Sequence, residues 1–124
     1  PREDPAMGFA ADLGALRTSP VDEKTLQAIQ ALIDEEKLTP EIRAEAYVAL
    51  GRAHQEAGDH RRALLSFLRV CFDPPLMPFP GPRADALHLA AEAFGQVKSA
   101  DWRERSAALR GELQSKYPNS RWVQ

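Results

Sequence analysis

The chain has little of what many catalytic and membrane-spanning proteins need. Its 124 residues include one cysteine, Cys71, so no internal disulfide can form. No apolar run approaches the roughly 20 residues that a membrane helix requires. The net charge is −2, which gives no electrostatic reason to expect binding to nucleic acid or to an anionic membrane.

Signals for strands and for catalytic chemistry are also scarce. The sequence contains only five valines and three isoleucines, β-branched residues that favour strands. No alternating run is flanked by turn residues. There is no glycine-rich phosphate loop, no H-E-x-x-H and no G-x-S-x-G. We therefore expect no enzyme, no catalytic residue and no cofactor.

The histidines and the cysteine are read as structural. His54, His60 and His88 have no metal-ligand spacing, and we expect His54 to pack within a hairpin and His60 to be solvated. Cys71 lies in an apolar segment, where a cysteine acts as a small hydrophobe. A catalytic cysteine would need a nearby histidine, which the sequence cannot show.

Helical periodicity is present throughout. Hydrophobic residues make up 44% and charged residues 27%, the composition of an ordinary globular domain. The pattern predicts an all-α fold of about six helices joined by short turns as antiparallel hairpins. The expected ranges are 7–17, 19–36, 40–57, 60–72, 83–97 and 101–117.

Capping residues mark several of these ends. Ser19-Pro20 and Thr39-Pro40 are typical helix starts, and Gly58 is a typical C-terminal stop. Asp101 with Glu104 forms a possible capping box. The helix that ends at Phe72 is apolar around most of its circumference, so we expect it to be packed on several sides.

One 34-residue stretch, 44–77, carries a repeat pattern. It reads Tyr47-x2-Leu50-Gly51-x2-His54, then Gly58, Ala63-x3-Phe67, Val70 and Pro75. These spacings resemble those of the tetratricopeptide repeat. In that pattern Gly51 and Ala63 are small where two helices cross closely. A generic antiparallel helical bundle is the alternative.

A second, divergent copy spans 84–122, with Leu87, Phe94, Leu113 and Tyr117-Pro118 in the rhythm of the family. The expected organisation is a single domain, 1–124. It comprises a degenerate hairpin (1–43), a repeat (44–77), an inserted Pro-rich turn (78–83) and the divergent repeat (84–122). The resemblance implies a short right-handed superhelix of stacked hairpins.

The resemblance also implies a binding face, because the first helices of successive hairpins line a groove in this family. Trp102 and Trp122 are expected to pack on the core, with exposed anchors as the alternative. An ordinary solvated face is the alternative to groove binding. The matching outward positions give the candidate protein-binding residues Val48, Arg52, Gln55, Glu56, His88, Glu92 and Gln96, beside Glu45 and Asp85.

The stretch FDPPLMPFPGPR, residues 72–83, is predicted to be an enlarged inter-repeat turn. We expect Phe79 and Leu76 to fold back onto the hairpin ends, since apolar side chains are not left in water without cost. The competing hypothesis is that Met77 and Phe79 form an exposed contact for a partner.

The resemblance implies a non-enzymatic module that binds or scaffolds another protein or peptide, as part of a larger bacterial protein. The ending Tyr117-Pro118-x-Ser120 is similar to bacterial family members, several of them cell-envelope assembly factors, so an envelope or periplasmic setting is implied. The chain starts PREDPAMGF, without an initiator Met, which is expected of an excised piece. The alternatives are a regulatory or spacer domain of a larger enzyme or sensor, a self-association module and a small enzyme.

Overall fold

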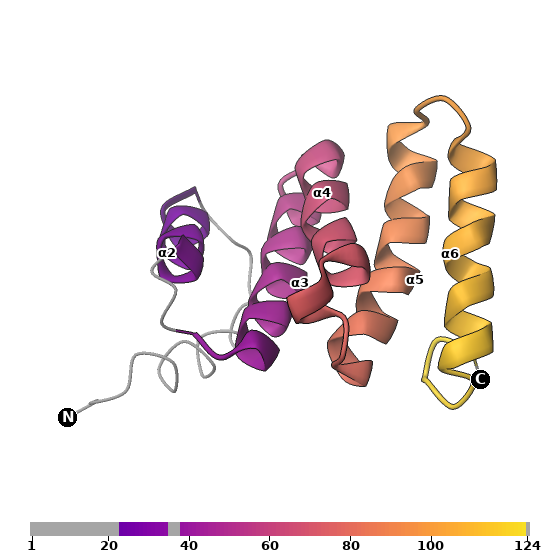
Figure 1. Cartoon of the computed structure of the whole chain (residues 1–124). Coiled ribbons are helices and arrows are strands. Elements are labelled where there is room, and N and C mark those ends of the chain that lie inside the picture. The colour runs from indigo at the N-terminus through magenta and orange to yellow at the C-terminus, as the bar shows by residue number, and fades with distance from the viewer. Residues whose placement is uncertain (1–22, 35–37, 124) are drawn as a thin grey trace.

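The computed structural model describes residues 23–34 and 38–123, and within them it contains helices and no strand. The all-α prediction is therefore confirmed. The helices follow one another across the molecule in chain order, with α4 overlapping α3 in this view (Figure 1), and α3 contacts both α4 and α5. They are α2 (Glu23–Asp34), α3 (Pro40–Glu56), α4 (His60–Phe72), the 3-10 turn η1 (Pro74–Leu76), α5 (Pro80–Val97) and α6 (Trp102–Lys116).

Two expected features lie outside the described residues: the first helix, 7–17, and the start at Ser19-Pro20. The predicted helix starts of α3 and α4 are confirmed by their capping bonds. The Thr39 hydroxyl accepts a hydrogen bond from the Ile42 amide at 3.3 Å, and Asp59 accepts one from the Arg62 amide at 3.1 Å. Gly58, in the turn between α3 and α4, has φ of 82°, a conformation that favours glycine.

Two other helix starts differ from the prediction. Asp101, before α6, has φ of 60° and its side chain makes no capping bond, so the capping box with Glu104 is wrong. Helix α5 begins at Pro80, earlier than the expected start near Arg83. The first turn of a helix has no intrahelical use for its amide hydrogens, so Pro80 and Pro82 fit there.

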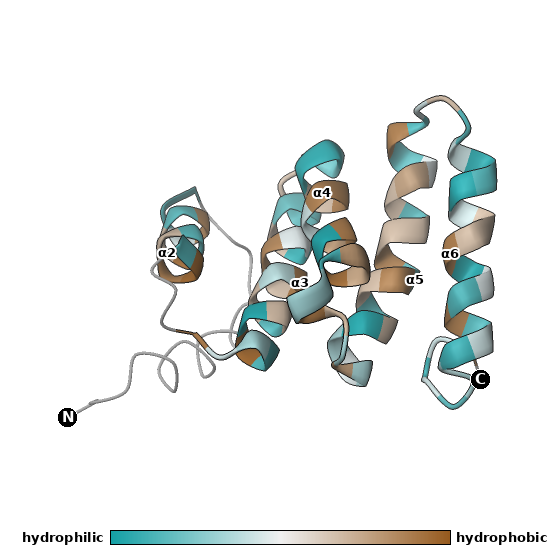
Figure 2. Ribbon diagram, viewed as in Figure 1, coloured by the Kyte–Doolittle hydropathy of each residue, from teal (hydrophilic) through white to brown (hydrophobic). Residues whose placement is uncertain are grey.

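The core consists of two clusters. The larger lies between α3, α4, α5 and α6, and the smaller joins α2 to α3, with Tyr47 packed against both. Figure 2 shows hydrophobic residues along α4 and α5, whereas α6 is mainly hydrophilic on its outer side. Helix α6 therefore presents a polar surface on its outer side.

Close crossing of α3 and α4 depends on Gly51. A Cβ atom added to Gly51 would lie 2.7 Å from Phe67 Cδ1 and 2.8 Å from Phe67 Cζ, closer than carbon atoms approach without displacement. Phe67 and Ala63 are fully buried. The small residues that the repeat pattern places at the crossing are thus in contact positions, as expected.

The Pro-rich turn is folded onto the core. Leu76 is 1% exposed and Phe79 is half-buried against the larger cluster, which confirms that both side chains fold back. Arg83, at the end of the turn, is 2% exposed. No sequence pattern indicated this burial, because an arginine near a helix start is usually solvated.

Candidate functional site

Helix α4 is packed on several sides, as its apolar composition predicted, but one of its faces is exposed. Leu65 is 64% exposed and Phe72 is 58% exposed, and they are the large exposed hydrophobic residues of the described chain. The opposite side of the helix, with Phe67, Val70 and Cys71, is fully buried. Among the described elements, α3 and α5 make most of the contacts of α4, with a smaller contribution from η1, and Leu65 and Phe72 lie on the face that they leave exposed.

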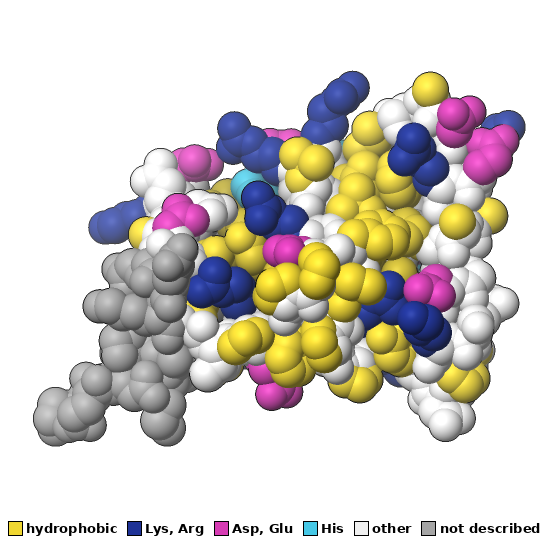
Figure 3. Space-filling model, viewed as in Figure 1, with side chains coloured by type: hydrophobic (Ala, Val, Ile, Leu, Met, Phe, Trp, Pro, Cys, Tyr) yellow, Lys and Arg dark blue, Asp and Glu magenta, His cyan; other side chains and the backbone are white. Residues whose placement is uncertain are grey.

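Phe72 borders a groove of about 610 Å³ between α4 and α6. Leu68 and Phe72 of α4 form one wall, Phe94 of α5 lies between, and Ala108 and Leu109 belong to the α6 wall. Figure 3 shows hydrophobic side chains gathered in this space between the two helices. We call it the α4/α6 groove.

Small residues on α6 explain why the groove is open. Ala108 and Gly111 lie one turn apart and both line the groove. A Cβ added to Gly111 would meet no atom within 4 Å. Side chains of this size cannot fill the space opposite Leu68 and Phe72.

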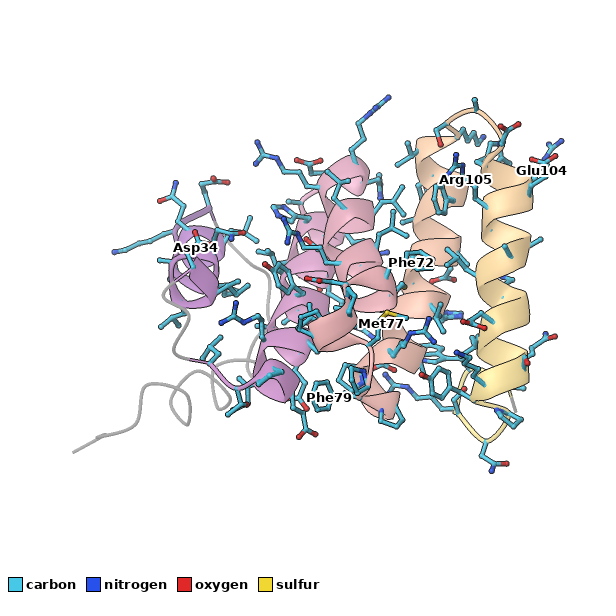
Figure 4. All side chains as sticks on the ribbon, in the orientation of Figure 1. Asp34, Phe72, Met77, Phe79, Glu104 and Arg105 are labelled. Carbon is cyan, nitrogen blue, oxygen red and sulfur yellow. The ribbon has the colours of Figure 1, made fainter. Side chains whose placement is uncertain are left out.

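Charged residues stand at the two ends of the groove. Arg105, near the start of α6, is exposed and forms no ion pair with any residue that the structure describes. Figure 4 shows Arg105 on the side of α6 that faces α5, and Glu104 on the other side. Glu112 is already paired, with Arg83 at 3.2 Å and with Lys116 at 3.6 Å.

A second groove, of about 510 Å³, lies on the other side of α4. Leu65, Arg62 and Arg69 of α4 line it, together with Tyr47 and His54 of α3 and the polar side of α2. The Arg69 guanidinium lies 5.4 Å from the Tyr47 ring centroid. Polar and charged groups make up much of this groove, so it lacks the apolar character of the α4/α6 groove.

The face expected to bind a partner is formed by α3 and α5, which contact each other. Val48 was expected to point outward, but it is 3% exposed and belongs to the larger core cluster. It is buried because α5 packs over this part of α3. Arg52 and Gln55 are half-buried, whereas Glu56, Glu92 and Gln96 are exposed.

The chain's own C-terminal segment covers part of this face. The Trp122 ring stacks on the His88 ring at 3.9 Å between centroids, and Trp122 Nε1 donates a hydrogen bond to Asp85 Oδ1 at 2.7 Å. Arg121 donates to the same oxygen at 3.3 Å and lies over the indole. The expected packing of Trp122 is confirmed, and His88 is held within the molecule.

Trp102 also packs as expected. It is half-buried against the larger core cluster, and a Cβ at Gly95 would lie 3.7 Å from its ring. Met77 and Phe79 are both half-buried. In the described part of the chain, the most exposed aromatic residue next to a groove is thus Phe72, which lies at a predicted helix end and which no sequence motif singled out.

Burial favours the neutral forms of Cys71 and His54. Burial raises the pKa of the Cys71 thiol to about 12, against a smaller opposing effect of Arg83. Burial also lowers the pKa of His54, which is half-buried. His60 begins α4 and is half-buried, so the prediction of a solvated turn residue is only partly right.

No group of three or more His, Cys, Asp or Glu side chains in the described ranges is arranged to hold a metal ion. Among the helices described, none has the length and apolarity needed to cross a membrane.

Comparison with family models, with curated proteins and with solved structures found no match to this chain. The resemblance to the tetratricopeptide repeat thus stays a prediction from the sequence.

Proposed function

We propose that this chain is a non-enzymatic module that binds or scaffolds another protein through stacked, tetratricopeptide-like helical hairpins. The exposure of Phe72 beside the α4/α6 groove carries the proposal. Exposed apolar surface in water costs about 25 cal/mol per Å², and a contiguous apolar concavity on a small domain is typical of an interaction site. The groove has apolar walls and no catalytic constellation.

The state of the nucleophilic groups supports binding over catalysis. Cys71 is fully buried, and with a pKa of about 12 its thiol is protonated at neutral pH. A cysteine nucleophile needs an accessible thiolate. His88, which could act as a base, has its ring covered by Trp122.

Packing of the hairpins supports the tetratricopeptide-like part of the proposal. The contact of Gly51 with Phe67 lies at the crossing of α3 and α4, where the repeat pattern requires a small residue. In a generic bundle this glycine would have no assigned role. From this local contact we extend the proposal to the whole chain, whose hairpins would stack as a superhelix.

Affinity capture from the cells that make the protein tests the function. The baits are the wild-type chain, Phe72→Ser at the groove and Arg52→Glu on the α3/α5 face, each checked for its helical spectrum. We expect the wild-type chain to retain specific proteins and Phe72→Ser to lose them. A wild-type bait that retains no specific protein would overturn the proposal.

A further inference from the structure

We propose that the α4/α6 groove binds one amphipathic helix of a partner protein, with apolar side chains in the groove and an acidic side chain against Arg105. This inference rests on the proposed function and adds the chemistry of the partner.

The lining sets the apolar side of the partner. Leu68, Phe72, Phe94, Ala108 and Leu109 offer aliphatic and aromatic surface. Polar ligand groups placed among them would lose hydrogen bonds to water without replacement, which is unfavourable. Apolar side chains gain from the same desolvation, so they are the fitting occupants.

The length of the groove fits a short helix. Its α6 wall runs from Arg105 through Ala108 and Leu109 to Glu112, a helical stripe spaced at i, i+3, i+4 and i+7. Seven residues of rise correspond to roughly 10 Å, or two turns. A helix laid along this stripe presents apolar side chains at the same spacing.

A second copy of the chain is a poorer fit. Eight residues line the groove, whereas a standard protein interface uses about 20–30 residues on each side. A groove of this extent matches one face of a single helix rather than the face of a whole domain.

The charges set the polar side of the partner and its direction. Arg105 at one end has no ion-pair partner among the residues that the structure describes, whereas Glu112 at the other end already has Arg83 and Lys116 as partners. A carboxylate on the partner therefore gains a complement at the Arg105 end, and a cation gains none at the Glu112 end. A salt bridge at the edge of the groove mainly sets the orientation of the partner helix and raises its association rate.

Gly111 provides a blocking variant that leaves the core intact. Gly111 lines the groove, and a Cβ added at this position would meet no atom within 4 Å. Gly111→Trp should fill the groove, and Gly111→Ala is its matched control, which keeps the groove open. Replacing a helical glycine removes its helix-propensity penalty, so neither variant should unfold the chain.

A random peptide library prepared by mRNA display serves as the probe. It is selected on the wild-type chain after removal of peptides that bind Gly111→Trp. We expect enriched sequences with apolar residues at i, i+3 or i+4 and i+7 and an Asp or Glu next to them. Enrichment of basic peptides, of alternating strand-like peptides or of no peptide overturns the inference.

The enriched peptide is then synthesised and its affinity is measured by fluorescence anisotropy. Gly111→Trp should abolish the binding and Gly111→Ala should retain it. Arg105→Glu should weaken it roughly ten-fold, and exchanging the acidic residue of the peptide for Lys should restore it. Equal binding by wild type, Gly111→Trp and Arg105→Glu contradicts the groove and its charge.

Light scattering separates the remaining outcomes. If the wild-type chain is a dimer and Gly111→Trp is a monomer, the occupant is a second copy and the inference is wrong. If partner capture succeeds equally with wild type and Gly111→Trp, the proposed function stands and the groove inference fails. If nothing is captured by any bait, the proposed function itself fails.

Discussion

The guanidinium of Arg83 donates two hydrogen bonds to the backbone carbonyl oxygen of Cys71, from Nε at 3.1 Å and from Nη2 at 3.0 Å. Cys71 is in the last turn of α4, whose carbonyls lack partners within their helix. A buried arginine from α5 therefore caps α4, and its positive charge lies at the negative end of the α4 dipole. Burial acts to lower the pKa of Arg83, but hydrogen bonds to Tyr117 and Glu112 raise it overall, so Arg83 stays charged.

Arg83→Met should lower the free energy of unfolding by roughly 2–4 kcal/mol, because a buried carbonyl loses its donors and Glu112 loses a partner. Urea denaturation followed by circular dichroism measures the change. Arg105→Met is the control, since Arg105 is exposed and unpaired, and it should change stability by less than about 0.5 kcal/mol. Equal effects of the two substitutions would contradict the capping role.

Gly51→Ala and Gly111→Ala should change stability in opposite directions. Both glycines lie inside helices, so each substitution gains up to about 1 kcal/mol in helix propensity. At Gly51 the new methyl group meets the Phe67 ring, and overpacking of this kind costs about 1–3 kcal/mol. Thermal melts of the two variants give the comparison. A Gly51→Ala protein as stable as Gly111→Ala would show that α3 and α4 are not closely packed.

Phe67 and Phe72 should respond differently to truncation, although they lie on the same helix. Phe67→Ala removes a fully buried ring and should cost about 3–5 kcal/mol. Phe72→Ala removes a ring that is 58% exposed and should cost less than about 1 kcal/mol. The denaturant midpoints of the wild-type chain and the two variants, measured under the same conditions, give the two changes in stability. A large loss for Phe72→Ala would mean that this ring belongs to the core.

Stability should fall as the pH decreases through about 6.5. Burial lowers the pKa of His54 and His88 below their usual value of 6.5 in the folded protein. The unfolded chain therefore binds more protons than the folded chain in this range, and acid favours unfolding. Midpoints measured at pH 7.5 and 5.5 test this, and the double variant His54→Gln with His88→Gln should show a smaller difference. An unchanged difference would assign the pH dependence to other groups.

The Cys71 thiol should not react in the folded protein. It is fully buried and burial raises its pKa to about 12, so the thiolate that attacks disulfide reagents is scarce and shielded. Labelling with Ellman's reagent should be complete in denaturant and should follow the unfolding rate in buffer. Rapid labelling under native conditions would show that α4 opens locally.

Local chemistry and repeat spacing in the sequence predicted much of the fold. The hydroxyl of Thr39 and the carboxylate of Asp59 cap helices that they directly precede, so three or four residues of sequence contain the whole interaction. The spacing from Gly51 to Phe67 placed a small residue opposite a large one, because a hairpin fixes which turns of its two helices meet. Composition alone excluded a disulfide framework.

Tertiary packing decided the rest. The apolar pattern of α4 could not show which face is covered, because that depends on Ala108 and Gly111 of α6, whose small side chains leave Phe72 at an open groove. Val48 is buried only because α5 packs beside α3. Arg83 could be recognised as a cap for α4 only once its helix was placed against Cys71 and Glu112. Burial is a property of two surfaces in contact, and the sequence of one helix specifies only one of them.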